Sequence, residues 1–569
     1  MADELSSRPA PARGDDIRTD VLIAGGGPCG LMLANELGRR GVRTLLVEPK
    51  PGTAFNPQAN ATQARTMEHF RRLGFAQEIR EQGLPADHPT DIAYFTRFSR
   101  HELARLRLPT ARQAAATVKG LGGSWSAAEL PHRVSQKFVE ATLLRHALAW
   151  SSNEIRHGWQ LLQFTDRGSE VEAQVASMDG TASRTVTARY LVGVDGARST
   201  VRQQLGIGYG GATGFKREFM GGRMFALYCR VPAFHGAFPH DKAWMYVSVN
   251  SQRRAFMASV EGQSEFAFHA AVHDGEDADA WTEDDARRIF SEAMGCALPI
   301  EVLSMLTWTA GHALVAEHFQ KGRVFLGGDA VHLFTPTGGL GYNTAVEDAV
   351  NLGWKLAHVL QGRAPESLLD TYEVERKPLA ERNTGYARHF ADSVGLFQAT
   401  PELEQDTAAG ERARQAASVH LNAHVRLEFN IPGVTFGGRY DGSPIIVADG
   451  SRPPGDKPNE YVPTACPGGR PPHAWLADGR SLYDTFHFEW TLLALGPDAP
   501  DASAFERAAL LAGLDLRVVR HTAPELLALY EAPLVLIRPD QMVAWRGSDA
   551  TDATQVLNTC RGAHRPPAR

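Results

Sequence analysis

Three glycines near the N-terminus are the first sign of chemistry in this sequence. The stretch "VLIAGGGPCG" places Gly25, Gly27 and Gly30 in the G-x-G-x-x-G spacing. The first glycine of this spacing allows a tight turn, the second lets the backbone approach a pyrophosphate, and the third lets a helix pack closely on a strand. The N–H groups at the start of that helix then face the phosphates. The stretch predicts a dinucleotide site, either for a nicotinamide that comes and goes or for a flavin that stays.

The residues around the glycines predict the βαβ unit that such a site requires. The apolar run at 20–24 predicts a buried strand, "GLMLANELGRRG" has helical spacing, and "VRTLLVE" predicts a second strand that ends at Glu48. Glu48 lies 23 positions after Gly25, where a carboxylate can accept hydrogen bonds from ribose hydroxyls. This context makes the glycine motif a strong signal rather than a weak one.

Two later segments place a carboxylate at the end of a predicted strand. "YLVGVDGARSTVR" contains Asp195 and Gly196, and "VFLGGD" contains Gly328 and Asp329 before a Gly-rich loop and a helix that we expect to start near Asn343. A carboxylate beside a helix N-terminus can bind the hydroxyls of a ribitol chain, and the loop offers backbone donors to an electron-rich atom. Taken alone, each segment also fits an ordinary strand-to-helix turn.

The three motifs, in this order and spacing, resemble the single-component FAD-dependent aromatic hydroxylases of the p-hydroxybenzoate hydroxylase and phenol hydroxylase type. The resemblance covers about residues 18–395, and the early loop is most similar to the 2,4-dichlorophenol 6-monooxygenase type and to polyketide-tailoring hydroxylases. It implies a resident FAD, NADPH or NADH as a transient reductant without a Rossmann domain of its own, and O2 as co-substrate. The implied reaction is hydroxylation of a phenolic or phenol-like heteroaromatic substrate through a C4a-hydroperoxyflavin.

The resemblance also implies which residues bind the cofactor, position by position. The chain departs from the family at "NPQAN", where Gln58 replaces a basic residue expected to contact a phosphate or NAD(P)H. We expect Cys29 to pack beside FAD rather than to act as a redox centre. The implied FAD-binding residues are Gly25, Gly27, Pro28, Cys29, Gly30, Glu48, Arg65, Gln136, Asp195, Gly196, Gly328, Asp329, Pro336, Gly339, Gly341, Tyr342 and Asn343.

The candidates for contact with the substrate lie mostly outside the glycine motifs. Asn60 stands where some relatives have a histidine, and Arg223 suits an anionic substrate. Tyr228 and Tyr246 fall on predicted strands, where either can hydrogen-bond a substrate hydroxyl or be a plain sheet tyrosine. Pro336, in the loop before the last motif helix, is the fifth candidate.

The fold class implied is α/β, with a Rossmann-like FAD-binding domain of the p-hydroxybenzoate hydroxylase type. The segments "CPGGRPPHAWLADGRSLYDTF" and "APLVLIRPDQMVAWRG" resemble the C-terminal domain of the phenol hydroxylase branch, which is thioredoxin-like without the redox C-x-x-C pair. The expected limits are a flexible tail at 1–18, FAD-binding parts at 19–205 and 319–398, an inserted β-rich substrate domain at 206–318 and the C-terminal domain at 399–569.

Composition narrows the possible partners. The net charge of −6, without a long basic block, argues against nucleic acid. The five cysteines form no C-x-x-C pair, so no metal site is expected. The N-terminus lacks the apolar core of a signal peptide, and no apolar run reaches membrane-spanning length. We therefore expect a cytoplasmic protein that binds a small aromatic substrate, touches no membrane and forms a homo-oligomer.

Two other functions remain open at this stage. The same fold performs Baeyer–Villiger oxidation or epoxidation of polyketides, and a non-catalytic flavin-binding protein would share the first glycine motif. Halogenation is disfavoured because the sequence has no W-x-W-x-I-P segment. The composition is compatible with bacterial secondary metabolism or catabolism. The sequence leaves open the substrate, the position hydroxylated, the catalytic base and the choice between NADH and NADPH.

Overall fold

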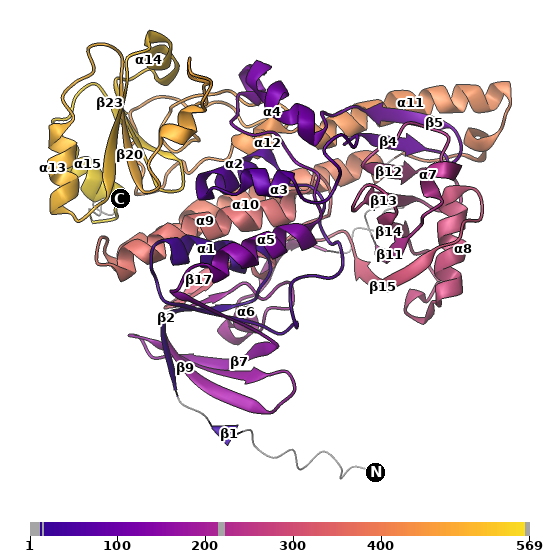
Figure 1. The fold of residues 1–569 in the computed structure, drawn as a ribbon, viewed down its shortest axis with the longest axis horizontal. Coiled ribbons are helices and arrows are strands. Elements are labelled where there is room, and N and C mark those ends of the chain that lie inside the picture. The colour runs from indigo at the N-terminus through magenta and orange to yellow at the C-terminus, as the bar shows by residue number, and fades with distance from the viewer. Residues whose placement is uncertain (1–11, 14–15, 214–221, 396, 564–569) are drawn as a thin grey trace.

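The computed structural model describes residues 12–13, 16–213, 222–395 and 397–563, so most of the expected tail at 1–18 lies outside the described residues. Figure 1 shows an α/β body in the centre, a second sheet with α8 and α11 on the right, and the C-terminal part in yellow on the upper left. No helix within the described residues is both long and apolar enough to cross a membrane.

The central body is built on a sheet with the order β17-β18-β9-β2-β3-β6, in which every pair except β17–β18 is parallel. Val21–Ala24 of β2 are all buried, as expected for a strand covered on both faces. Strands β7 and β8 extend β9 as an antiparallel ribbon. The bounds are β1 (Ala12–Arg13), β2 (Ile17–Ala24), β3 (Thr44–Glu48), β6 (Asn153–His157), β7 (Trp159–Asp166), β8 (Val171–Ser177), β9 (Ala182–Gly193), β17 (Gln320–Lys321) and β18 (Val324–Leu326).

Helices α1 and α9 pack against each other beside this sheet, and α5 packs on α1. Helix α9 begins at Leu340, slightly before the expected start near Asn343. A three-stranded sheet, β10-β16-β19, lies next to this body. The bounds are α1 (Pro28–Arg39), α2 (Ala64–Leu73), α3 (Ala76–Arg80), α4 (Ala111–Gly120), α5 (Gln136–Leu148), α6 (Thr200–Leu205), α9 (Leu340–Leu360), α10 (Thr371–Gly395), β10 (Tyr209–Ala212), β16 (Ala313–Ala316) and β19 (His332–Leu333).

The second body is a seven-stranded sheet with the order β15-β11-β14-β13-β12-β4-β5. It extends beyond the expected limits 206–318, because β4 and β5 come from the earlier FAD-binding segment. The bounds are β4 (Ile92–Phe95), β5 (Glu102–Leu106), β11 (Arg223–Arg230), β12 (Met245–Ser248), β13 (Ala255–Ser259), β14 (Glu265–Ala271), β15 (Glu301–Thr309), α7 (Phe234–Ala237), α8 (Glu283–Met294) and α11 (Ala408–Phe429).

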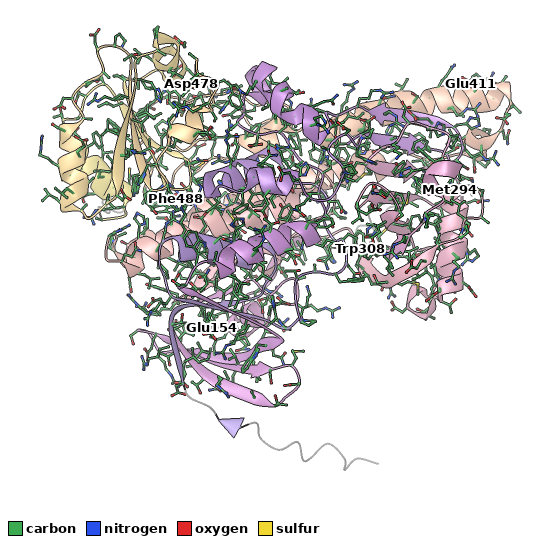
Figure 2. All side chains as sticks on the ribbon, in the orientation of Figure 1. Glu154, Met294, Trp308, Glu411, Asp478 and Phe488 are labelled. Carbon is green, nitrogen blue, oxygen red and sulfur yellow. The ribbon has the colours of Figure 1, made fainter. Side chains whose placement is uncertain are left out.

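The two faces of this second sheet have different neighbours. Phe268 and other alternate residues form an apolar core under α8 and α7. The opposite face, which carries Trp308, packs with Ala61 of the early loop and Ala391 of α10. Figure 2 shows Met294 on the α8 side and Trp308 on the side of the central body. The alternation of side chains along each strand therefore separates a structural face from a face turned toward the central body.

The C-terminal part contains a four-stranded sheet with the order β21-β20-β22-β23, in which β20 and β21 are parallel and the other pairs antiparallel. Cys466 and Cys560 of this part are buried and free, so the described residues hold no dithiol here. The bounds are α12 (Pro432–Phe436), β20 (Trp490–Leu495), α13 (Ser503–Leu511), β21 (Leu516–His521), α14 (Pro524–Tyr530), β22 (Leu534–Ile537), β23 (Val543–Gly547) and α15 (Ala553–Cys560).

Candidate active site

The three motif glycines differ in what surrounds them. Gly25 has φ +116°, and a Cβ there would collide with the carbonyl of Val194. A Cβ on Gly30 would collide with the carbonyl oxygen of Gly25, whereas a Cβ on Gly27 would meet nothing within 4 Å. The first and third glycines are therefore required by the turn and the packing of the chain. The second leaves open space, which is what a closely bound pyrophosphate needs.

Two helices begin at this point without a side-chain cap. The N-cap residue of α1 is Gly27 and that of α9 is Gly339, and within the described residues no side chain caps either end. The first N–H groups of each helix consequently lack intrahelical partners and carry the positive end of the helix dipole. Such helix ends bind anions and electron-rich atoms.

The turn at Gly328 joins the two helix ends. A Cβ on Gly328 would lie 3.3 Å from Cβ of Cys29 in α1 and 3.4 Å from Cβ of Ala345 in α9. Asp329 follows directly and is exposed to solvent, although desolvation by the surrounding protein raises the pKa of its carboxyl group. We call this region the helix junction: the N-termini of α1 and α9 with Gly328 and Asp329 between them. It combines backbone donors with one accessible acceptor.

Glu48 is placed at the edge of the junction by β3. Its Oε2 accepts a hydrogen bond of 2.6 Å from N of Gly26, and its Oε1 accepts one of 3.0 Å from N of Lys50. Each carboxylate oxygen has a second lone pair, so the side chain can hold the glycine loop and still accept from a hydroxyl.

The early loop is fastened to the start of α9 by side-chain amides. Asn343 donates from Nδ2 to O of Ala61 at 2.9 Å and accepts at Oδ1 from N of Gln63 at 2.8 Å. Gln63 in turn donates from Nε2 to O of Gly338 at 2.7 Å. Tyr342 and Thr62 share a hydrogen bond of 3.1 Å between their hydroxyls. Asn343 and Tyr342 therefore position the loop against the first turn of α9.

Gln136 and Cys29 also lie in this neighbourhood. Gln136 starts α5, its N donates to O of Ala59 at 2.7 Å, and its Nε2 donates to Oε1 of Glu140 at 2.7 Å. Cys29 is buried, and burial raises the pKa of its thiol well above the ordinary value. A protonated, buried thiol is a packing group, in keeping with the expectation for Cys29.

Arg65 and Asp195, two of the predicted FAD contacts, make hydrogen bonds to other parts of the protein. The buried guanidinium of Arg65 donates to the carbonyls of Asp540 at 3.1 Å and Gln541 at 3.0 Å, and it pairs with Glu68 at 3.1 Å. The expectation that Arg65 contacts FAD is therefore corrected, because its donors face the C-terminal part.

Asp195 caps the first turn of α6. It accepts from Oγ of Ser199 at 2.5 Å and from N of Thr200 at 2.7 Å. Desolvation raises the pKa of this carboxyl group. The D-G turn thus positions α6, while Gly196 supplies the positive φ of +81°.

Two of the predicted substrate contacts are structural. Tyr246 is fully buried on the α8 face, where its hydroxyl accepts from N of Ala243 at 3.0 Å and its ring packs on Phe234 at 5.2 Å. Arg223 pairs with Asp279 and donates to Oγ1 of Thr307, also on that face. Neither residue points toward the junction, because their side chains alternate to the face that α8 covers.

The other three candidates lie closer to the junction. The hydroxyl of Tyr228 accepts from Nζ of Lys137 at 2.8 Å and donates to Glu265, and its ring meets Phe55 of the early loop edge-on at 5.5 Å. Asn60 has a buried Oδ1 that lacks a partner among the described residues, and Pro336 is exposed. Desolvation raises the pKa of Tyr228 above its ordinary value, so its phenol is not a base at neutral pH.

The sequence reasoning missed the residue that holds the Gly328 turn in place. The buried carboxylate of Asp348 accepts from N of Gly328 at 3.1 Å, from Nε2 of His332 at 2.8 Å and from Nε of Arg376 at 2.8 Å. The sequence feature that could have pointed to Asp348 is an acidic residue on the side of α9 that otherwise faces the core. No three His, Cys, Asp or Glu side chains of the described part are grouped to hold a metal ion.

A Rossmann-like body with the helix junction, a second sheet beside it and a C-terminal part with its own four-stranded sheet fit the p-hydroxybenzoate hydroxylase type of fold. The family model for an FAD binding domain matches residues 18–387, and the model for an aromatic-ring hydroxylase C-terminal domain matches residues 464–563. The chain belongs to this family of FAD-dependent aromatic-ring monooxygenases, and the prediction of an FAD-dependent oxidoreductase is confirmed.

Individual relatives agree along nearly the whole chain. Phenol 2-monooxygenase from Pseudomonas sp. (strain EST1001) is 29% identical, over 100% of this chain and 97% of its own length. The structure of the rebeccamycin biosynthetic enzyme RebC with reduced flavin has a TM-score of 0.86 and 34% identity, over 97% of this chain and 100% of that chain. The ternary complex of aklavinone-11 hydroxylase with FAD and aklavinone has a TM-score of 0.78 and 30% identity, over 96% and 99%.

Proposed function

We propose that this monooxygenase hydroxylates a phenolic or phenol-like heteroaromatic substrate, with FAD held at the helix junction and NADPH or NADH as a visiting reductant. The observation that carries the proposal is the position of the turn at Gly328, which lies against Cys29 in the first turn of α1 and Ala345 in the second turn of α9; neither helix has a side-chain cap at its N-terminus among the described residues. Bound there, FAD would supply two-electron redox chemistry and the activation of O2.

Different residues of the helix junction would bind different parts of the elongated FAD molecule. The open space at Gly27 and the first N–H groups of α1 would receive the pyrophosphate, and Glu48 would accept from the adenosine ribose. Asp329, the accessible acceptor, would bind ribitol hydroxyls. The first turn of α9 would place its N–H groups at the electron-rich edge of the flavin ring, where negative charge develops on reduction.

The early loop would shield the reaction from water. Its residues 59–63 are tied to the start of α9 through Asn343 and Gln63, and Phe55 reaches across to Tyr228 of the second sheet. A loop that bridges the two bodies can cover a substrate bound between them. Two similar proteins, phenol 2-monooxygenase and the aklavinone-11 hydroxylase solved with aklavinone, support the proposal that the substrate is aromatic.

Turnover of the purified holoenzyme tests the proposal directly. NADPH and NADH oxidation and O2 uptake would be measured with and without phenol and 1-naphthol, and the product would be analysed by mass spectrometry. The expected product is the intact ring with one added oxygen. A ring-expanded lactone would instead indicate Baeyer–Villiger oxidation, and an epoxide would indicate epoxidation. FAD binding without substrate-stimulated NAD(P)H oxidation for any aromatic would reject the proposal in favour of a non-catalytic flavoprotein.

We also propose that the enzyme acts in the cytoplasm as a homo-oligomer. Light scattering coupled to size-exclusion chromatography would give the mass in solution. A mass of 62.0 kDa, that of one chain, would reject the oligomer.

A further inference from the structure

On the sheet face that is turned toward the central body, one histidine lies in a cross-strand row of otherwise apolar side chains. In register across the sheet, His269 of β14 lies between Ala226 of β11 and Phe256 of β13. The next neighbours in the same row are Leu306 on β15 and Val247 on β12. Since side chains in register point to the same face, these residues form one continuous row.

This row borders the helix junction through the early loop. Ser304, two residues before Leu306, donates to Oδ1 of Asn56 at 2.5 Å. Trp308, two residues after Leu306, packs in the cluster that contains Ala61, and O of Ala61 accepts from Asn343 of α9. The face that carries His269 is thus joined to the first turn of α9 by loop residues 56–61, and Figure 2 shows Trp308 on this inner side.

Two aromatic rings fix the imidazole of His269. It stacks on Phe256 with ring centroids 4.6 Å apart and an interplanar angle of 12°. Its Nδ1 accepts a hydrogen bond of 3.2 Å from Nε1 of Trp308. An indole N–H only donates, so Nδ1 must be the unprotonated nitrogen and the neutral ring must carry its proton on Nε2.

The protonation state agrees with this geometry. Desolvation lowers the pKa of His269 to about 4, so the ring is neutral at physiological pH. Nδ1 makes the only hydrogen bond of this ring within the part of the chain that the structure describes, which leaves the Nε2–H group without a protein acceptor there. The residue is half-buried rather than enclosed.

The surroundings of His269 suit a flat ring. On the side away from Phe256 the neighbour is Ala226, and Ala267 and Ala271 lie two positions before and after His269 on β14. At the border of this area, Phe55 is 63% exposed and Leu306 is 38% exposed. Small residues around one donor, bounded by exposed apolar side chains, leave room for an aromatic system that covers the donor.

We propose that His269 determines substrate specificity: its Nε2–H donates a hydrogen bond to an oxygen atom of a flat, fused-ring aromatic substrate that lies against Phe256 and Trp308. The inference rests on the proposed function for the site but concerns binding, not turnover. It names the substrate class as fused aromatics with a phenol, phenolate or carbonyl oxygen at the position that meets the imidazole. Trp308 is a positioning residue, because it fixes the tautomer.

Binding to the oxidised holoenzyme tests the proposal without turnover. The probes are 1-naphthol and 1-methylnaphthalene, which have similar size but differ in the oxygen, titrated by isothermal calorimetry. A variant His269→Phe keeps the stacking and removes the donor. We expect it to weaken 1-naphthol binding by about 5–20-fold and to leave 1-methylnaphthalene unchanged within about twofold, because a polar ligand atom loses its partner.

Two further variants separate positioning from packing. His273→Phe, at an exposed site just after β14, should bind both probes like the wild type. Trp308→Phe should weaken 1-naphthol binding by about 2–5-fold, because the ring of His269 is then free to adopt the other tautomer. In ¹⁵N-histidine NMR spectra, wild-type His269 should show the Nε2-protonated tautomer, and 1-naphthol should shift that N–H resonance downfield.

The inference would be overturned if His269→Phe weakened both probes equally, since that result is a packing effect. No loss for either probe, or no binding of 1-naphthol to the wild type, would overturn it as well. Failure of the proposed function is a separate result, because an enzyme that oxidises no NAD(P)H with any aromatic can still discriminate between the two probes.

Discussion

The first turn of α9 and the middle of the same helix handle polar groups in opposite ways. The first turn leaves its N–H groups without a side-chain cap among the described residues and lies beside the solvent-exposed Asp329. The middle buries side-chain charges completely: Lys355 pairs with Glu375 at 2.6 Å, and Arg538 of the C-terminal part pairs with the same carboxylate at 2.6 Å. The first turn thus presents backbone donors, whereas the middle of the helix joins two parts of the chain.

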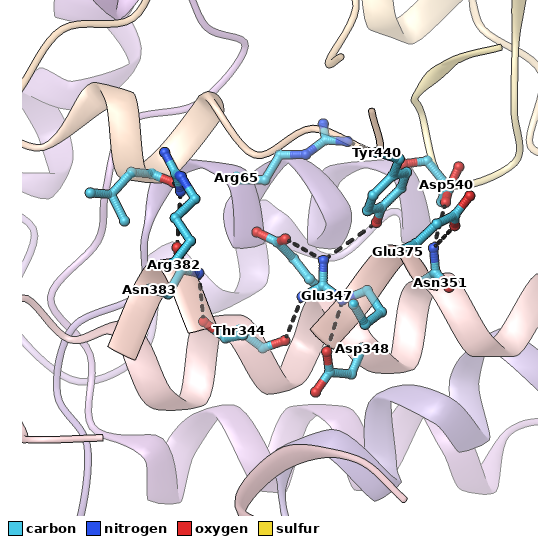
Figure 3. Close-up of polar contacts among 12 residues, drawn as sticks. Arg65, Thr344, Glu347, Asp348, Asn351, Glu375, Arg382, Asn383, Tyr440 and Asp540 are labelled. Carbon is cyan, nitrogen blue, oxygen red and sulfur yellow. Dashed lines mark hydrogen bonds and ion pairs between the residues drawn. The ribbon is translucent and has the colours of Figure 1, made fainter. Parts of the chain in front are cut away.

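The charged side chains of the buried cluster pair with one another. Figure 3 shows Glu375 beside Asn351 and Asp540. Asn351 donates from Nδ2 to Glu375 at 2.7 Å. Although desolvation alone would raise the pKa of Glu375, the charges of Arg538 and Lys355 hold it well below the ordinary value. The opposite charges of this cluster therefore compensate each other within the protein. The comparison indicates that the candidate ligand site on α9 lies where backbone donors lack a side-chain cap, not where charged side chains are concentrated.

Among the single substitutions, removing the shared carboxylate should have the largest effect on stability. The variant Glu375→Ala leaves Lys355 buried without its counter-charge and Arg538 paired with Asp540 alone, and breaking a buried pair in this way typically costs about 3–5 kcal/mol. We expect the free energy of unfolding, measured by urea denaturation of the apoprotein, to fall by that amount. Glu381→Ala, at an exposed position of the same helix, is the control and should change it by less than about 0.5 kcal/mol. A loss below about 1 kcal/mol for Glu375→Ala would contradict the contrast.

The glycines of the junction should separate ligand binding from folding. Gly27→Ala places a methyl group in open space, so apoprotein stability should change little while FAD binding weakens at least tenfold, on the order of 1.4 kcal/mol or more. Gly30→Ala drives a methyl group into the carbonyl of Gly25 and should reduce both stability and FAD binding. Thermal unfolding and FAD titration of the apoprotein measure the two effects. Equal behaviour of the two variants would refute the distinction.

Acidification should destabilise the fold before the carboxylates of the cluster titrate. Desolvation lowers the pKa of His132 and His473 to about 3 and that of His269 and His358 to about 4. In the unfolded chain these histidines take up protons near pH 6.5, whereas in the folded protein they stay neutral until the pH approaches 4. Between pH 6.5 and 4 the unfolded state therefore binds more protons, and the free energy of unfolding falls as the pH falls. One pKa unit corresponds to about 1.4 kcal/mol, so each histidine can remove on the order of 3 kcal/mol. Urea denaturation at pH 7, 6, 5 and 4 would show this fall. A constant free energy of unfolding across that range would contradict it.

The smallest effect on stability is expected at Tyr246, one of the substrate contacts that the sequence predicts. Tyr246→Phe removes one hydrogen bond from N of Ala243 in the core under α8, which costs about 0.5–1.5 kcal/mol of stability. Because the side chain does not face the junction, kcat and KM for the aromatic substrate should stay within about twofold of the wild type. A tenfold loss of kcat with unchanged stability would show that the side chain of Tyr246 faces the active site and not α8.

Much of the cofactor site could be predicted because its constraints are local. The spacing of Gly25, Gly27 and Gly30 predicts where backbone must approach backbone or ligand, and Glu48 follows at the end of the next strand. The substrate face could not be predicted in this way. Tyr246 alternates with Val247 along β12, and a period of two does not tell which of the two faces α8 and which faces the central body.

The sequence by itself determined the cofactor, because the order of the glycine, D-G and G-D motifs and their steric demands are properties of short segments. Only the tertiary structure decided what distant segments do to each other. It turned Arg65 to carbonyls 475 and 476 residues away, and it set His269 against Phe256 and Trp308 through the register of four strands. The physical reason is that register and side-chain direction depend on pairing between strands far apart in the chain, which no local spacing encodes.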